Sequence, residues 1–202
     1  MPKIVDKKEK RAEILKAAVR VFAKTGLPKT KMMTIAEEAG IGKGTIYEYF
    51  KSKEELFIAA FEAFVEQSNA QVARRLRWID DPVKKLRAYF DAWNDILEGE
   101  FLDFADIILD FWAEGLRTKK TKATWNLNKM YSEYRIQIIQ ILQEGIRQKK
   151  FKPVDTTIAS SIIIGTLDGL MVQWIMDRDL FRFSEAVEQL ANIIIDGLTE
   201  GS

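Results

Sequence analysis

The sequence predicts an all-α protein of about nine helices. Apolar residues recur every three or four positions along most of the chain, and this spacing places them on one face of an α-helix. Residues that favour a helix start, such as Ser52, Asp81 and Asp155, stand directly before several of these segments. No segment alternates apolar and polar residues as a half-buried strand does. Together, these observations favour a purely helical fold.

The first helix is expected to end at Gly26, and two short helices follow between residues 30 and 50. Gly40 stands at the expected end of the first short helix, where a left-handed conformation is favoured. Gly42 and Gly44 open the second. A helix, a turn that contains glycine and a second helix are the parts of a helix-turn-helix. The residues expected to face inward are Ile14, Leu15, Ala18, Val21, Phe22, Met32, Ile35, Ala36, Ala39, Ile46 and Phe50.

The second short helix has the chemistry of a DNA-contacting element. Its first turn offers free backbone N–H groups and a partial positive charge, which together attract a phosphate. Lys43 adds a full charge, and the glycines on either side let a DNA backbone approach closely. The polar side chains that are left for the DNA groove are Lys43, Thr45, Tyr47 and Tyr49.

Residues 12–57, AEILKAAVRVFAKTGLPKTKMMTIAEEAGIGKGTIYEYFKSKEELF, resemble the DNA-binding domain of the TetR family of bacterial transcriptional regulators. The most specific pieces are TIAEEAGIGKGTIYEYF and the KSKEEL that follows. The resemblance implies an all-helical dimer, with three N-terminal helices on DNA and a larger C-terminal domain that binds a small inducer. At one position the chain departs from the family, because Lys31 stands where a second Thr is common. The DNA contacts expected from the resemblance and the helix chemistry are Thr30, Lys31, Gly42, Lys43, Gly44, Thr45, Tyr47, Tyr49 and Lys53, with Gly42 and Thr45 nearest the base edges.

The distribution of charge supports a DNA-contacting head on a separate body. Residues 1–60 hold 13 Lys and Arg against 8 Asp and Glu, whereas residues 61–202 hold 18 against 22. A basic surface attracts the phosphates of nucleic acid. We therefore expect a helix-turn-helix domain over residues 1–52 and a ligand-binding and dimerisation domain over residues 53–202.

The second domain is expected to contain six helices. The first is long and begins with a capping box of Ser52 and Glu55. Asp81 is expected to cap the next helix, which begins with a proline. Asp155 and Ser184 are the expected caps of the last two helices. The expected ranges are about 53–77, 82–98, 101–114, 124–149, 156–176 and 185–198.

The helix over residues 156–176 is the most apolar of the chain, and we expect it to be fully buried. It approaches the roughly 20 residues that span a membrane, but Asp168 lies in its middle, so we favour the buried helix. Small residues recur every four positions on it and let another backbone approach closely. A two-fold dimer through this helix and the last one explains their apolar surface. The expected interface comprises Ser161, Gly165, Gly169, Val172, Val187, Leu190 and Ile194.

Large aromatic residues are in excess in the central helices. Any single one is more often core than binding site, but as a set they indicate a cavity with apolar walls and a few polar groups. Asp168 is the candidate polar anchor; the alternatives are a buried carboxylate that pairs with an Arg and a hydrogen bond across the dimer. The candidate pocket residues are Tyr89, Trp93, Phe104, Ile108, Phe111, Trp112, Trp125, Met130, Tyr131, Tyr134, Asp168 and Met171.

Four acidic residues form a stripe on the expected helix over residues 101–114. We interpret the stripe as a solvated face because it lies off the apolar face of the helix. The alternative is recognition of a cationic ligand. The stripe consists of Asp103, Asp106, Asp110 and Glu114.

The chain contains no Cys and no His. Their absence removes thiolate nucleophiles, imidazole bases and the usual ligands of zinc, copper and non-haem iron. No constellation of other residues indicates catalysis, so an enzyme is not favoured and no cofactor is expected. No signal peptide is visible, and the cytoplasm is the expected compartment.

Two functions remain. The first is a ligand-responsive DNA-binding regulator, most simply a repressor that an apolar or amphipathic molecule releases from a palindromic operator. The second is a helical protein that binds DNA or a partner without a small-molecule inducer. For the first, the expected partners are double-stranded operator DNA, the inducer and a second copy of the chain.

Overall fold

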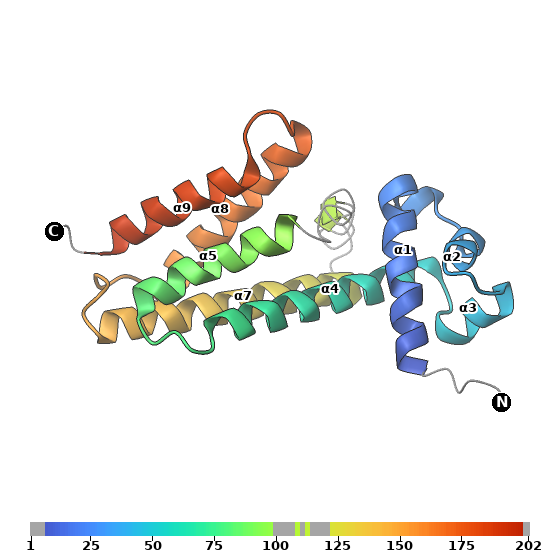
Figure 1. Cartoon of the computed structure of the whole chain (residues 1–202), viewed down its shortest axis with the longest axis horizontal. Helices are drawn as coiled ribbons and strands as arrows, with labels where there is room; N and C mark the ends of the chain where they lie inside the picture. Colours follow the sequence, from blue (N-terminus) through green and yellow to red (C-terminus); the bar gives the residue numbers. More distant parts are fainter. Residues whose placement is uncertain (1–6, 99–107, 110–111, 114–121, 200–202) are drawn as a thin grey trace. The chain divides into compact units, whose positions relative to one another are not determined.

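The computed structural model describes residues 7–98, 108–109, 112–113 and 122–199, and it confirms an all-α fold. These residues include eight bounded helices and no strand (Figure 1). The predicted helix over residues 101–114 falls mostly outside them, although 108–109 and 112–113 are helical. The helices are α1 (Lys7–Lys29), α2 (Met32–Glu38), α3 (Lys43–Tyr49), α4 (Lys53–Leu76), α5 (Pro82–Glu98), α7 (Lys122–Arg147), α8 (Thr156–Met176) and α9 (Phe183–Leu198).

The chain divides into two compact units. The first comprises residues 1–67 and 101–127, and the second comprises residues 68–100 and 128–202. The residues of α4 and of α7 are therefore divided between the two units. The domain boundary expected between residues 52 and 53 remains a prediction.

The core of the first unit holds α2 and α3 in place. The helix α1 packs on α2, and α2 packs on α3. Phe22 of α1 contacts Phe57 of α4 edge to face, with 5.1 Å between the ring centroids. Between α2 and α3, Gly40 takes the predicted left-handed conformation, with a φ of 64°. The structure thus confirms the helix-turn-helix.

Gly26 interrupts α1, as the sequence predicted. Its φ of 69° and ψ of 159° break the helix, and one further turn follows. The hydroxyl of Thr30 donates to the carbonyl oxygen of Gly26 at 2.8 Å. The ammonium of Lys53 donates to the carbonyl oxygens of Leu27 and Pro28 at 2.9 and 2.8 Å. These last bonds fix the start of α4 to the end of α1.

The second unit contains the end of α4, with α5, most of α7, α8 and α9. The helix α9 packs on α5 and on α8. Arg87 of α5 donates to the amide oxygen of Asn192 on α9 at 2.8 Å. On α4, Asn69 donates to the carboxylate of Glu133 at 2.8 Å and accepts from Gln137 at 3.0 Å, which ties α4 to α7. The core of this unit includes Leu86, Tyr89, Phe90, Ala92, Ile138, Leu142, Val187 and Ala191.

Side-chain caps set the start of three helices as predicted. The carboxylate of Asp81 accepts two backbone N–H groups from the first turn of α5, both at 2.9 Å. The carboxylate of Asp155 accepts two from α8, at 2.9 and 3.0 Å. The hydroxyl of Ser52 accepts the N–H of Glu55 at 3.1 Å, which is one half of the predicted capping box, whereas the carboxylate of Glu55 accepts the N–H of Lys51 at 2.8 Å and not that of Ser52.

The predicted cap at Ser184 is wrong. The helix α9 begins at Phe183, so Ser184 lies inside the helix. The N-cap residue is Arg182, whose side chain makes no cap bond. The ring of Phe183 packs on Trp174 of α8, with 5.7 Å between the ring centroids. This tertiary contact draws the aromatic residue into the helix, so the local capping preference of serine does not decide where the helix begins.

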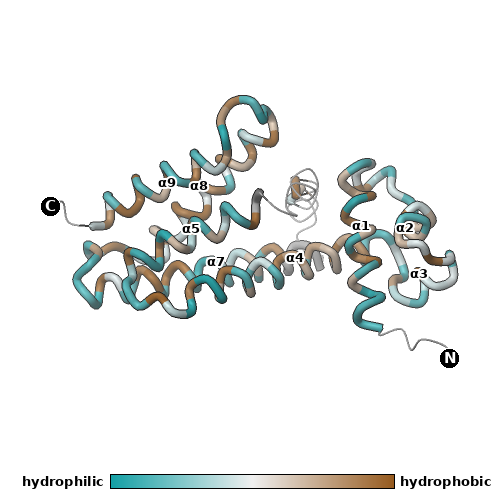
Figure 2. The backbone as a smooth tube through the Cα atoms, in the orientation of Figure 1, coloured by the Kyte–Doolittle hydropathy of each residue, from teal (hydrophilic) through white to brown (hydrophobic). Residues whose placement is uncertain are grey.

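The prediction that residues 156–176 are fully buried is wrong for the protomer. Only 22% of the most apolar 18-residue window of α8 is buried, although the mean hydropathy of that window is 1.5. By length and composition α8 meets the requirement for a membrane span, but a single such helix is weak evidence, because core helices of soluble proteins meet it too. Figure 2 shows hydrophobic residues along α8 and α9. The described part of the protomer leaves much of this apolar surface uncovered.

Candidate DNA interface and ligand site

The helix α3 buries one face and leaves another free. Ile46 is fully buried, which fixes the rotation of the helix about its axis. Lys43 and Tyr47 are exposed, and Thr45 and Tyr49 are half-buried. The free face therefore carries a cation, an aromatic hydroxyl and a small hydroxyl, which are groups that bind phosphates and base edges.

The first turn of α3 is open to an anion. Gly42, its N-cap residue, is exposed and provides no side-chain cap. A Cβ atom added at Gly44 would meet no described atom within 4 Å. The first backbone N–H groups of the helix are therefore not covered by a capping side chain, and they suit a phosphate oxygen.

Three further DNA contacts were predicted at the starts of α2 and α4. Lys31 is exposed at the N-cap of α2. The side chain of Thr30 is turned inward, since the residue is only 4% exposed. Two of the three donors of the Lys53 ammonium bind carbonyl oxygens of α1, which leaves one for DNA. These internal roles of Thr30 and Lys53 were not predicted from the sequence, because both depend on the break in α1. DNA contact by the nine residues remains a prediction.

The carboxylate of Asp168 on α8 has a single hydrogen-bond donor among the described residues. The hydroxyl of Tyr131 on α7 donates to it at 2.9 Å. Burial raises the pKa of Asp168 to about 6, and the bond from Tyr131 offsets part of that rise. The alternative of a pair with an Arg is not found in the described part of the chain.

Aromatic side chains of α5 and α7 lie in the neighbourhood of this carboxylate, since Tyr131 bonds it and its charge acts on Tyr89 and Tyr134. The rings of Trp93 and Tyr134 lie 4.9 Å apart, and those of Tyr89 and Trp93 lie 6.4 Å apart. Burial raises the pKa of the Tyr89 and Tyr134 hydroxyls, and the charge of Asp168 raises both further. The indole nitrogen of Trp93 is buried, and its interaction with the Tyr89 hydroxyl lowers the pKa of that hydroxyl, against the larger effect of burial. The structure thus brings five of the predicted pocket residues into one cluster of Tyr89, Trp93, Tyr131, Tyr134 and Asp168, named the Asp168 cluster below.

The remaining candidates for the pocket are less closely defined. Met130 and Met171 are buried in the second unit. Ile108 is buried and Trp112 is half-buried in the first unit, whereas the Asp168 cluster belongs to the second. The predictions that lie outside the described residues concern Phe104, Phe111, the side chain of Trp125 and the acidic stripe of Asp103, Asp106, Asp110 and Glu114.

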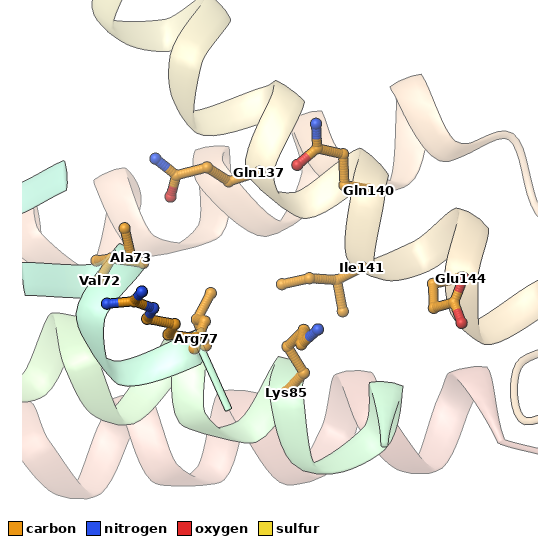
Figure 3. Close-up of a pocket in the computed structure, with 9 residues that line it drawn as sticks. Val72, Ala73, Arg77, Lys85, Gln137, Gln140, Ile141 and Glu144 are labelled. Carbon is orange, nitrogen blue, oxygen red and sulfur yellow. The ribbon is translucent and has the colours of Figure 1, made fainter. Parts of the chain in front are cut away.

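A groove of about 330 Å³, which was not predicted from the sequence, opens among α4, α5 and α7 (Figure 3). It combines two cations, two side-chain amides and a carboxylate with apolar side chains. The amide oxygen of Gln137 is buried with no partner among the described residues. No pattern within one helix reveals the groove, because its walls come from three. The lining residues are Val72, Ala73, Leu76, Arg77, Lys85, Gln137, Gln140, Ile141 and Glu144.

The residues predicted for a dimer interface divide into two groups. Val187 and Leu190 are buried within the protomer. A Cβ atom added at Gly165 or Gly169 would meet no described atom within 4 Å, so the described protomer leaves open space there. Ser161 is exposed, and Val172 and Ile194 are half-buried. The sequence analysis missed the large apolar side chains that are exposed on the same two helices, which include Ile158, Ile162 and Ile193.

Two family models match the chain. The model of bacterial regulatory proteins of the tetR family matches residues 14–60. The model of the C-terminal domain of BetI-type transcriptional repressors matches residues 82–199, which is more than half of the chain.

Known proteins resemble the chain over nearly its whole length. The fatty acid metabolism regulator protein of Bacillus subtilis (strain 168) is 25% identical over 193 residues, which are 95% of this chain and 97% of that protein. The crystal structure of FadR from Bacillus subtilis in complex with stearoyl-CoA matches with a TM-score of 0.79 and 26% identity, over 93% of this chain and 98% of that one. A putative transcriptional regulator from Saccharomonospora viridis in complex with choline matches with a TM-score of 0.86 and 22% identity, over 96% of this chain and 100% of that one. At 22% sequence identity, the similarity to the Saccharomonospora viridis structure shows a shared fold alone.

Asp168→Asn is expected to stabilise the protein at neutral pH. The unfolded chain releases the proton of Asp168 near the ordinary pKa of 3.8, whereas the folded chain holds it until about pH 6. The wild type therefore loses stability relative to the variant as the pH rises from about 4 to about 6, and above that window the deficit is about 2–3 kcal/mol. Urea unfolding of both proteins at several pH values measures the difference.

Asp196→Asn is the matched control, because Asp196 is exposed on α9. Its free energy of unfolding should follow that of the wild type at every pH. If the difference in unfolding free energy between the wild type and Asp168→Asn stayed constant from pH 4 to pH 7, burial would not raise the pKa of Asp168.

Proposed function

Because the chain belongs to the TetR family of bacterial regulatory proteins, we propose that it is a homodimeric repressor that an apolar or amphipathic small molecule releases from a palindromic operator. The observation that carries the proposal is the helix-turn-helix, in which buried Ile46 leaves Lys43 and Tyr47 on a free face of α3. Members of the family are transcriptional regulators, and we infer no catalytic activity for this chain. The cytoplasm, where operator DNA is accessible, is the proposed compartment.

We propose that α8 and α9 form a two-fold interface with a second copy of the chain. Ile158, Ile162, Gly165 and Gly169 follow one another at helical spacing and so share a face of α8. Both isoleucines are exposed, and both glycines leave room for a close approach. A soluble monomer rarely exposes a contiguous apolar patch of this kind. Two-fold symmetry in the protein leads to an operator with inverted half-sites.

We propose that the inducer binds in the second unit at the Asp168 cluster. The cluster combines buried aromatic surface with a carboxylate that has a single hydrogen-bond donor among the described residues, and apolar walls with a few polar groups are the usual composition of a small-molecule site. FadR of Bacillus subtilis was solved with stearoyl-CoA, an amphipathic molecule, and this supports an amphipathic inducer here. Under the rival function, DNA binding without an inducer, the role of Asp168 would instead be the hydrogen bond across the dimer named in the sequence analysis.

Lys43→Ala is expected to weaken binding to all duplex sequences alike, because a lysine at the open start of α3 contacts phosphate. Each lost phosphate contact should reduce the slope of log affinity against log salt by about 0.9 per protomer. Thr45→Ala should instead change the preferred sequence, since base contacts carry specificity. Fluorescence anisotropy with duplexes selected from a random library, at several salt concentrations, measures both effects.

Lys84→Ala is the control for the loss of a positive charge, since Lys84 is exposed on α5. It should bind DNA as the parent protein does. If Lys43→Ala and Thr45→Ala also bind as the parent does at every salt concentration, α3 is not the DNA-contacting helix.

Ile162→Arg is expected to yield monomers, because it would bury an unpaired charge in the two-fold interface. Ile136→Arg on α7 is a closely matched control, since the two isoleucines are 55% and 54% exposed. Sedimentation velocity should show a dimer for the wild type and for Ile136→Arg, and a monomer for Ile162→Arg. A dimer of unchanged stability for Ile162→Arg would place the interface elsewhere.

The switch itself is expected to be reciprocal. An amphiphile that weakens operator binding tenfold has a coupling free energy of about 1.4 kcal/mol, and operator DNA must weaken binding of that amphiphile by the same factor. Stearoyl-CoA and a cationic amphiphile are titrated with tryptophan fluorescence as the signal, with and without the selected operator. Release of the operator by either one supports the proposal. Equal affinity of each amphiphile in the two titrations would mean that the ligand site does not control DNA binding.

A further inference from the structure

The groove among α4, α5 and α7 lies within the second unit and shares no residue with the Asp168 cluster. Its volume of about 330 Å³ is in the range of sites that hold small molecules. Val72, Leu76 and Ile141 give it apolar surface, and five of its other lining side chains are polar or charged. These polar groups determine which class of molecule the groove can hold.

Gln137, which lines the groove, has a hydrogen-bond acceptor without a donor, and a network of bonds fixes this orientation. The carboxylate of Glu133 can only accept, so the amide nitrogen of Asn69 has to face it, at 2.8 Å. The oxygen of Asn69 then accepts from the amide nitrogen of Gln137 at 3.0 Å. This leaves the oxygen of Gln137 buried, with no partner among the described residues. A buried acceptor of this kind favours a ligand that brings an O–H or N–H donor.

Two cations in the groove wall favour an anion. Figure 3 shows Arg77 and Lys85 extending from α4 and α5, across the groove from the side-chain amides of α7. Arg77 lies over the ring of Trp78, with 4.8 Å to the ring centroid. Within the described part of the chain, neither cation forms an ion pair with a carboxylate. Both charges are therefore available to a ligand that carries a negative charge.

The carboxylate of Glu144 also lines the groove, but its charge is already compensated. Arg147 donates to its two oxygens, at 3.0 and 2.5 Å, and the amide of Gln148 donates to one of them. The bond from Arg147 is the largest cause that lowers the pKa of Glu144, and the charge of Lys85 is the smallest. Glu144 therefore leaves the charge of Lys85 largely free for another anion.

Other occupants fit the groove less well. An organic cation would be repelled by Arg77 and Lys85. A neutral apolar molecule would leave both charges unpaired and would cover the acceptor of Gln137 without giving it a donor. An inorganic anion would not use the apolar walls, whose burial stabilises a complex with an organic molecule.

We propose that this groove is a second ligand site, which binds a small organic anion that also carries a hydroxyl or N–H donor and an apolar body. The anion lies beside Lys85 and Arg77, and the donor bonds the free oxygen of Gln137. The apolar body packs on Ile141. The site is separate from the one proposed for the inducer at the Asp168 cluster, and the inference does not depend on that proposal.

The test compares four probes built on one phenylpropyl skeleton, with isothermal titration calorimetry as the readout. The first, para-hydroxyphenylpropanoate, carries both the anion and the donor. The matched alcohol and amine, para-hydroxyphenylpropanol and para-hydroxyphenylpropylamine, differ from it only in charge, and para-methylphenylpropanoate lacks only the donor. The wild type should bind para-hydroxyphenylpropanoate at least about tenfold more tightly than each of the other three, a difference of about 1.4 kcal/mol.

Lys85→Met should weaken binding of para-hydroxyphenylpropanoate by at least about fivefold and leave binding of the alcohol unchanged, since methionine keeps the apolar stem without the charge. Arg77→Met should act in the same direction by a smaller factor, because Arg77 is exposed and its charge is screened by water. Lys84→Met is the matched control, since Lys84 is exposed on α5 directly beside Lys85 and does not line the groove. It should bind all four probes as the wild type does.

Several results would overturn the inference. They are undetectable binding of para-hydroxyphenylpropanoate, equal or tighter binding of any of the other three probes, and unchanged affinity in the folded groove variants. Arg77→Met keeps the test decisive if Lys85→Met folds poorly, because an exposed side chain is not part of the core. DNA takes no part in these titrations, so a failure of the proposed operator switch leaves the inference standing, and a failure here leaves the switch standing.

Discussion

Two seven-residue helices, α2 and α3, depend on burial for their existence. Helices of this length do not persist alone in water, because the cost of forming the first turn is not recovered. Ile35 and Ile46 are fully buried, and burial of each such side chain contributes about 1.5–3 kcal/mol. The same contacts fix the rotation of α3, and this rotation leaves Lys43 exposed. The surface that suits DNA is therefore a consequence of the core beneath it.

The second unit contains two features that are unfavourable in an isolated protomer. Apolar side chains such as Ile162 are exposed on α8, and Asp168 is partly buried with one neutral donor. Each feature costs free energy by itself, and each becomes favourable when a matching partner binds. An apolar helix face is complementary to a second copy of the same face, and a buried carboxylate is stabilised by hydrogen-bond donors or by a positive charge. The proposed interface and the proposed ligand site lie at these two places.

Local sequence signals predicted the elements well, and tertiary contacts account for what they missed. Asp81 caps a helix as expected, because the cap bonds lie within four residues of chain. Ser184 does not, because packing of Phe183 on α8 moved the helix start. The anchoring role of Lys53 depends on carbonyl groups about 25 residues away, which no local pattern reveals. For Asp168, the sequence indicated a polar anchor, but only the structure showed that a tyrosine holds it.

The end of α4 is tied to both helices that carry the aromatic rings of the Asp168 cluster. Arg75 pairs with Asp95 on α5, and Asn69 bonds Gln137 on α7. The helix α4 continues without interruption from these contacts back to Lys53, which holds the end of α1. An exposed ion pair contributes roughly 0.2–1 kcal/mol, which is the order of the 1.4 kcal/mol that changes operator affinity tenfold. Under the proposed mechanism, a shift in the balance of a few such contacts supplies a free energy of the size that a tenfold change in operator affinity requires.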